Sequence, residues 1–171
     1  YMPDLYVDGG KEIVVSGLGF EINFDETSDQ IHIPSELEIK RYGESLQISM
    51  PSDMKNSTVQ ITVGTLAEIE RLEFRTAFLR LSDSVSVETM EIKTAAGEIR
   101  GELWASKMIS IEGTSLSITG TLKAPEIVIA NVPALSFTGS VEAGKFSVQN
   151  GVALAFSMDS WNSGKRENKI Q

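Results

Sequence analysis

The sequence predicts an all-β fold: a β-solenoid with coils of 18 or 19 residues, preceded by an irregular N-terminal β segment. Three observations favour this fold, namely an internal repeat, a corner residue at a near-constant step, and apolar residues that alternate in pairs. The stretch LSITGTLKA at 116–124 returns as LSFTGSVEA at 135–143, an offset of 19 residues. Self-similarity at such a period is typical of proteins built from stacked repeats.

The first part of the chain alternates without a regular step. Its apolar pairs predict short strands with one buried face. These pairs are Ile13/Val15, Ile22/Phe24, Ile31/Ile33, Leu37/Ile39 and Leu46/Ile48. We expect residues 1–63 to form irregular strands that cap the solenoid, because open strand edges template aggregation.

A corner residue marks the regular part, which we expect at 64–161. It recurs at steps of 19, 18, 19 and 19, as Gly64, Asp83, Gly101, Gly120 and Gly139. Glycine and aspartate both tolerate the left-handed backbone region. The pattern therefore predicts a positive φ at this corner in every coil.

Three strands accompany each corner, because three sets of alternating apolar pairs recur with it. The first set includes Leu72/Phe74, Met90/Ile92, Ile109/Ile111, Ile127/Ile129 and Phe146/Val148; the second includes Leu79/Leu81, Leu116/Ile118, Leu135/Phe137 and Leu154/Phe156; the third includes Val85/Val87, Leu103/Ala105, Leu122/Ala124 and Val141/Ala143. Trp161 follows the last coil and is expected to cover that end, so residues 1–161 are predicted to be one domain. Residues 162–171 lack an apolar pattern and are expected to form a flexible tail.

The strands and corners resemble those of the bacterial putative adhesin domain family of unknown function, and of the related head-domain putative autotransporter adhesins. The resemblance covers about residues 13–156 and rests on LQISMP at 46–51 and on coils such as MEIKTAAGEI at 90–99. It implies a right-handed β-solenoid (β-helix) that is often attached to the bacterial envelope. It implies no established activity and supplies no catalytic residues.

Composition excludes several kinds of site. A net charge of −9 argues against nucleic acid and against an anionic membrane surface as partners. The chain has no cysteine and one histidine, His32, which is expected on the surface between two inward isoleucines. We therefore expect no metal, no cofactor and no catalytic residue. No signal peptide and no apolar run long enough for a membrane helix is visible, although the chain starts at Tyr rather than Met.

Hydroxyl residues form the one unusual outward feature. Ser117 and Thr119 in one coil would lie beside Ser136 and Thr138 in the next, making a flat neutral strip. Together with the resemblance, this favours a non-enzymatic, surface-binding protein of the adhesin type, with an unidentified protein or polysaccharide as partner. Two alternatives stay open: a carbohydrate-active β-helix enzyme, which would need clustered carboxylates, and a self-assembling scaffold.

Overall fold

The computed structural model describes residues 4–54, 58–149, 153–156 and 161–170, with side chains for the first two ranges. Its strands join into one 14-stranded sheet. They are β1 (Asp4–Asp8), β2 (Glu12–Asp25), β3 (Gln30–Pro34), β4 (Glu38–Tyr42), β5 (Ser45–Ser49), β6 (Val59–Gly64), β7 (Ile69–Leu81), β8 (Ser84–Ile99), β9 (Glu102–Ile118), β10 (Thr121–Ala130), β11 (Ala134–Phe137), β12 (Ser140–Gln149), β13 (Ala153–Phe156) and β14 (Trp161–Ile170).

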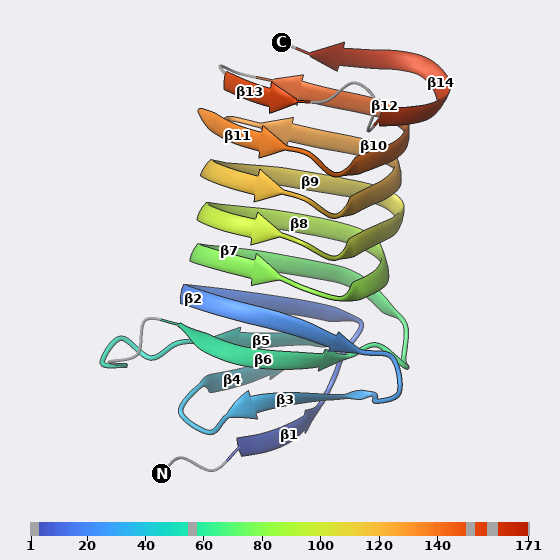
Figure 1. Cartoon of the computed structure of the whole chain (residues 1–171). Helices are drawn as coiled ribbons and strands as arrows, with labels where there is room; N and C mark the ends of the chain where they lie inside the picture. Colours follow the sequence, from blue (N-terminus) through green and yellow to red (C-terminus); the bar gives the residue numbers. More distant parts are fainter. Residues whose placement is uncertain (1–3, 55–57, 150–152, 157–160, 171) are drawn as a thin grey trace.

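The main path of the sheet runs in the order β1-β3-β6-β2-β7-β8-β9-β10-β12-β14. From β2 onward this path is parallel, and successive stretches of chain lie side by side from the N-terminal to the C-terminal end (Figure 1). Leu122 lies between Leu103 and Val141, its partners in the two neighbouring strands, each 19 positions away. Alternating residues therefore meet their equivalents in the next strand.

The predicted right-handed β-solenoid is wrong, although the all-β class is right. The described strands form a single mixed sheet rather than a closed stack of coils. Three of its strand pairs are antiparallel, namely β1 with β3, β3 with β6, and β4 with β5. The physical reason is that a constant repeat length predicts which residues become neighbours in the later strands. It does not determine how the irregular first sixty residues pair.

The core lies between two rows of strands. Figure 1 shows β11 and β13 in front of β10 and β12, and β9 pairs with both β10 and β11. The rings of Phe137 in β11 and Phe146 in β12 meet edge to face, with centroids 6.4 Å apart. The alternating apolar residues fill this space, and Ile111, Ile118 and Leu122 are fully buried as expected. Burial of such side chains is the main favourable term in folding.

The corner prediction is right for Asp83 and wrong for the glycines. Asp83 has a φ of 70°, whereas Gly64, Gly101, Gly120 and Gly139 are not among the residues with positive φ. Glycine is needed at the last three positions because the corners stack closely. A Cβ on Gly120 would overlap the carbonyl oxygen of Gly101, and that carbonyl accepts a hydrogen bond of 3.1 Å from the Thr121 amide.

The C-terminal segment also differs from expectation. The backbone of Trp161–Ile170 forms strand β14, paired with β12, where a flexible tail was expected from residue 162. The predicted cover by the Trp161 side chain lies outside the described side chains. Among the residues that the structure describes, no helix has the length and apolar character needed to cross a membrane.

Candidate functional site: an open trough on the outer face

The four predicted strip residues lie on one outer face. Ser117 in β9 and Ser136 in β11 are register partners. Thr119 and Thr138 follow the ends of these strands, and their amides donate hydrogen bonds of 2.9 and 3.0 Å to the carbonyls of Ile99 and Ile118. Ser117 is half-buried and the other three are exposed. The predicted outward register is therefore confirmed, while their role in binding stays a prediction.

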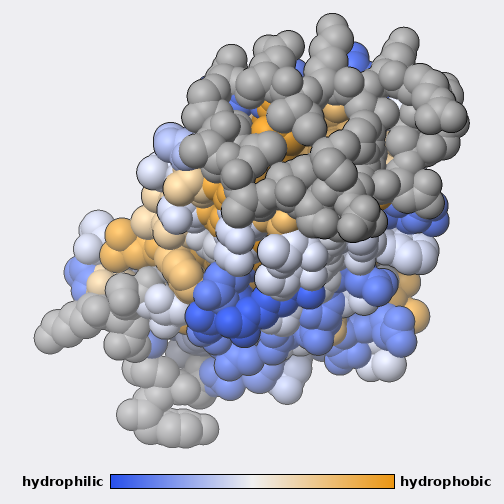
Figure 2. All heavy atoms as spheres, turned by 45° about the horizontal axis from the view of Figure 1, so that its top comes forward, coloured by the Kyte–Doolittle hydropathy of each residue, from blue (hydrophilic) through white to orange (hydrophobic). Residues whose placement is uncertain are grey.

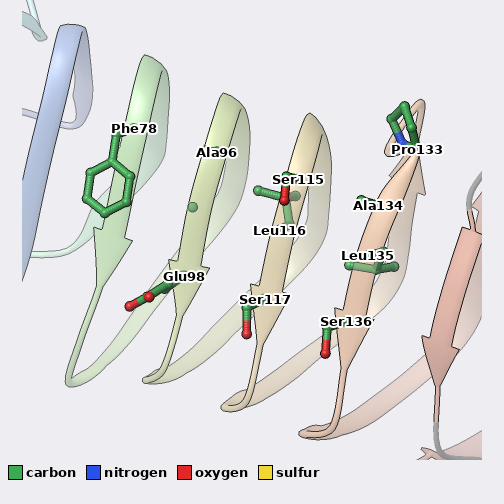
Figure 3. A pocket seen from close by; sticks show the side chains of 11 residues that line it. Phe78, Ala96, Glu98, Ser115, Leu116, Ser117, Pro133, Ala134, Leu135 and Ser136 are labelled. Carbon is green, nitrogen blue, oxygen red and sulfur yellow. The ribbon is translucent and has the colours of Figure 1, made fainter.

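A shallow hollow of about 540 Å³ lies beside two of these residues and is called the trough below. It is lined by Phe78, Ala96, Gly97, Glu98, Ser115, Leu116, Ser117, Pro133, Ala134, Leu135 and Ser136. Figure 3 shows the side chains of Glu98, Ser117 and Ser136 directed to the same side of their strands. Thr119 and Thr138 do not line the trough.

Small outward side chains make the floor of the trough open. Register places Phe78 beside Ala96, Ala96 beside Ser115, and Ser115 beside Ala134. A second row runs from Glu98 through Ser117 to Ser136. Alanine and serine are short, so the long side chains in these two rows are those of Phe78 and Glu98, at the β7 and β8 side. The trough is therefore a flat shelf with an aromatic wall.

A charged network fixes this wall. The Arg80 guanidinium lies 5.5 Å from the centroid of the Phe78 ring, and its Nη1 and Nε lie 2.6 and 2.9 Å from carboxylate oxygens of Glu21 and Glu98. Arg100 Nη2 lies 2.6 Å from the same Glu98 oxygen. The hydrogen bond from Arg80, aided by Arg100, holds the pKa of Glu98 below its usual value. Glu98 is therefore a fixed, ionised acceptor rather than a proton donor.

Some hydrophobic residues lie on the surface. Figure 2 shows hydrophobic residues collected on the left side of the molecule, the side on which β11 begins in Figure 1. Leu18, with 56% of its surface exposed, lies between the register pairs that join Gly17 to Thr76 and Gly19 to Phe78. The sequence pattern gave no sign that Phe78 would stand beside the serines, since an outward aromatic residue is common in strands.

The other charged clusters support the sheet. Glu73, only 3% exposed, forms ion pairs with Arg71 and Arg75, and Arg71 also pairs with Glu91. Lys93 is the register partner of Glu112, but its ammonium pairs with Glu91 at 3.8 Å. Of these ion pairs, Arg71 with Glu91 joins two neighbouring strands, whereas the others join residues two positions apart on the same strand.

His32 does lie on the outer face, half-buried, and contacts a nearby strand. Its Nε2 lies 3.0 Å from Asp4 Oδ2, and its ring stacks on Tyr6 with centroids 4.5 Å apart. Both partners belong to β1, so this contact holds β1 against β3. In the part of the chain that the structure describes, no three His, Cys, Asp or Glu side chains are grouped as metal ligands would be.

Comparison with known proteins gives structural neighbours only. No family model matches the chain, and no curated protein matches it. The chain is similar to a solved putative adhesin from Bacteroides fragilis, at 10% identity and a TM-score of 0.43, over 99% of this chain and 95% of that one. A putative adhesin from Parabacteroides merdae gives 11% identity and a TM-score of 0.38, covering 100% and 96%. A putative lipid binding protein from Parabacteroides distasonis gives 14% and 0.42, covering 100% and 96%. The names of two neighbours agree with the resemblance found from the sequence.

Proposed function

We propose that this protein is a non-catalytic binding module that holds an extended glycan in the trough and along the strip. The observation that carries this proposal is the placing of Ser117 and Ser136 in register beside Phe78 and a fixed Glu98. A sugar ring has apolar C–H surfaces and a rim of hydroxyl groups. The Phe78 ring can pack against the first, and the serine hydroxyls and the carboxylate can hydrogen-bond with the second.

The shape of the trough suits a polymer better than a small molecule. Pockets that retain small ligands bury most of the ligand surface. The trough is open and crosses β7, β8, β9 and β11, so a ligand lying in it stays exposed on one side. Binding through many weak contacts along a chain is the mode that such a surface favours, and a location at the cell envelope would expose it to polysaccharides.

A hydrolytic role is less well supported by the chemistry of the trough. Glycosidases use two carboxyl groups, one of which must carry a proton. Among the residues that line the trough, Glu98 is the one carboxylate, and two arginines keep it ionised. An open floor also leaves the reacting groups in water, where charges are screened.

Glycan binding by the purified chain tests the proposal. A panel of neutral and acidic oligosaccharides is titrated by calorimetry, and products are sought by chromatography. We expect binding without turnover. Ala134→Arg, which places a long side chain in the trough at an exposed position, should abolish binding, and the double variant Ser117→Ala/Ser136→Ala should weaken it about tenfold or more.

The matched control is Ser52→Ala/Thr58→Ala, which removes two exposed hydroxyls from the connection between β5 and β6, away from the residues that line the trough. It should bind as the unchanged protein does. Failure of the unchanged protein to bind any glycan would overturn the proposal. Glycan hydrolysis by the unchanged protein that is lost in Glu98→Gln would show that the protein is a carbohydrate-active enzyme instead. Binding that survives loss of all four strip hydroxyls and Ala134→Arg would move the site to another face.

A further inference from the structure

We infer that the glycan bound in the trough is one in which uronate and neutral sugars alternate, and that a uronate carboxylate binds to Arg75 and Lys93 just beyond the trough. This inference rests on the proposed function and names the class of ligand. It follows from a second shallow hollow, of about 520 Å³, which is called the cationic hollow below. Its lining residues are Arg75, Thr76, Lys93, Thr94, Ala95, Glu112, Gly113, Thr114 and Asn131.

The trough and the cationic hollow meet at one corner of the strands. Ala95 lines the cationic hollow and Ala96 lines the trough, and Thr114 and Ser115 are divided in the same way. Ala95 and Thr114 are exposed and short, so the corner itself is low. Figure 3 shows Ala96 and Ser115 on one side of the trough, with the second row on the other. Lys93 precedes Ala96 by three residues, about 10 Å of strand, so one extended ligand can reach both hollows.

Two cations stand side by side in the cationic hollow. Arg75 in β7 and Lys93 in β8 are register partners, and both are exposed. They are the one pair of cations among the register partners of the described strands. Like charges directly opposite each other destabilise a sheet. An anion bound between the two cations removes that repulsion.

The neighbouring carboxylates leave part of this positive charge free. Glu73 and Glu91 each precede their cation by two positions, on the side away from the trough, and Arg71 pairs with both of them. Three cations therefore share two carboxylates. Arg75 contacts Glu73 through Nε, and the Lys93 ammonium lies 3.8 Å from Glu91. Within the described part of the chain, the two Nη groups of Arg75 form no ion pair or hydrogen bond, so they can bind a ligand.

A carboxylate on the ligand suits this pair of cations. A guanidinium binds a carboxylate through two parallel N–H groups, and a lysine adds a compact charge with three donors. Glu112 is the one acid among the lining residues. It lies across Lys93 from Arg75, as the register partner of Lys93, and accepts a hydrogen bond of 3.5 Å from Asn131 Nδ2. Its charge confines the anion to the β7 and β8 side of the hollow.

The trough requires a neutral sugar next to that uronate. Two arginines hold Glu98 as a carboxylate in the trough. A uronate placed there would be repelled, because two negative charges at close range raise the energy of the complex. A neutral sugar can instead donate hydroxyl hydrogen bonds to Glu98. The two hollows together therefore match a glycan in which neutral and acidic units follow each other.

Hexasaccharides with different charge patterns test this inference. A hyaluronan hexasaccharide alternates uronate with an N-acetylated sugar, chitohexaose contains that sugar type alone, and hexagalacturonate has a carboxylate on every unit. Each is titrated by calorimetry at low and high salt against the unchanged chain, Lys93→Gln, Arg75→Gln/Lys93→Gln and Glu112→Gln. The matched control is Lys107→Gln/Lys123→Gln, which removes two positive charges that line neither hollow. Thermal unfolding of each variant checks that it is folded, and Lys93→Gln keeps all contacts of Glu73.

We expect the hyaluronan hexasaccharide to bind about tenfold more tightly than chitohexaose at low salt, and to lose that advantage at high salt. Arg75→Gln/Lys93→Gln should remove the advantage and leave chitohexaose binding unchanged, and Lys93→Gln should remove part of it. Glu112→Gln, which removes the nearby negative charge, should strengthen hyaluronan binding about twofold.

Equal affinity of the unchanged chain for the hyaluronan hexasaccharide and chitohexaose would overturn this inference and leave the proposed function standing. The same holds if Arg75→Gln/Lys93→Gln binds the hyaluronan hexasaccharide as well as Lys107→Gln/Lys123→Gln does. Tighter binding of hexagalacturonate than of the hyaluronan hexasaccharide would also overturn it, because the trough would then accept a carboxylate. Absence of any glycan binding by the unchanged chain would end both proposals.

Discussion

The N-terminal strands β1–β6 and the later strands β7–β12 bury their apolar residues in one core, yet they pair differently. In the later part, neighbouring strands are parallel and residues lie beside equivalents 18 or 19 positions away. In the first part, three antiparallel pairs combine with parallel pairing to β2. Regular spacing therefore produces rows of like side chains, whereas irregular spacing produces an individual environment for each residue.

Strand β2 belongs to both parts. It pairs with β5 through Glu12–Ser16, with β6 through Phe20–Asp25, and with β7 along much of its length. Because β2 pairs with strands of both parts, a loss of packing in one part also weakens the other. We therefore expect the two parts to unfold together rather than as separate units.

The largest expected effect tests that cooperativity. Ile118 in β9 and Ile61 in β6 are both fully buried, one in each part. Ile118→Ala and Ile61→Ala should each lower the free energy of unfolding by about 2–5 kcal/mol, through lost contacts and the cavity left behind. Denaturant unfolding followed by fluorescence and by circular dichroism should give one transition in both variants. A second transition in either would show that the parts are independent.

The corner glycines give the next largest effect and separate lack of space from backbone strain. Gly120→Ala should cost about 3 kcal/mol, because the added Cβ overlaps the Gly101 carbonyl. Gly43, in the hairpin of the first part, has a φ of 59° and open space around its Cα, so Gly43→Ala should cost about 1 kcal/mol from conformation alone.

Asparagine distinguishes the two causes. Asn tolerates a positive φ, so Gly43→Asn should be nearly neutral, while Gly120→Asn should be at least as destabilising as Gly120→Ala. The measurement is the free energy of unfolding of the four variants. If Gly120→Asn leaves the free energy of unfolding unchanged, close stacking is not the reason for glycine at this corner.

A smaller, local effect is expected at β1. The Arg41 guanidinium donates hydrogen bonds of 3.0 and 2.6 Å to the carbonyls of Gly9 and Asp8, at the end of this strand. Arg41→Ala should cost about 1 kcal/mol locally and speed hydrogen exchange of the β1 amides about fivefold. Lys40→Ala, at the neighbouring exposed position, is the control. Unchanged exchange in β1 would mean that its pairing with β3 and the His32 contacts hold the strand without help from Arg41.

Some of this arrangement could be predicted from the sequence and some could not. Alternation placed Ile118, Leu135 and Phe137 inward correctly, because a half-buried strand has a period of two. The step of the corner residues is real, but it does not reveal its cause, because a glycine that avoids an overlap and a glycine with positive φ look alike in a sequence. Antiparallel pairing in the first part left no periodic signal. Phe78 and Arg75 were missed because only their neighbours across the sheet distinguish them from ordinary strand residues.

The smallest expected effect concerns pH and the charges of β7 in the later part. Burial raises the pKa of Glu73, but hydrogen bonds and charges from Arg71 and Arg75 outweigh it and hold the pKa below its usual value. With a lower pKa in the folded state than in the unfolded state, the ionised carboxylate stabilises the protein above the unfolded-state pKa of about 4.3. That stabilisation is lost as the pH falls through the folded-state pKa.

Glu73→Gln should therefore be less stable than the unchanged protein at pH 7 and should lose less of its stability on acidification below about pH 4.3. Glu70→Gln is the control, because Glu70 is exposed and its one ion pair among the described residues, with the Lys11 ammonium, is long at 3.9 Å. Equal acid dependence of the unchanged protein and Glu73→Gln, measured by urea unfolding between neutral and acid pH, would show that the arginines do not stabilise the fold through this carboxylate.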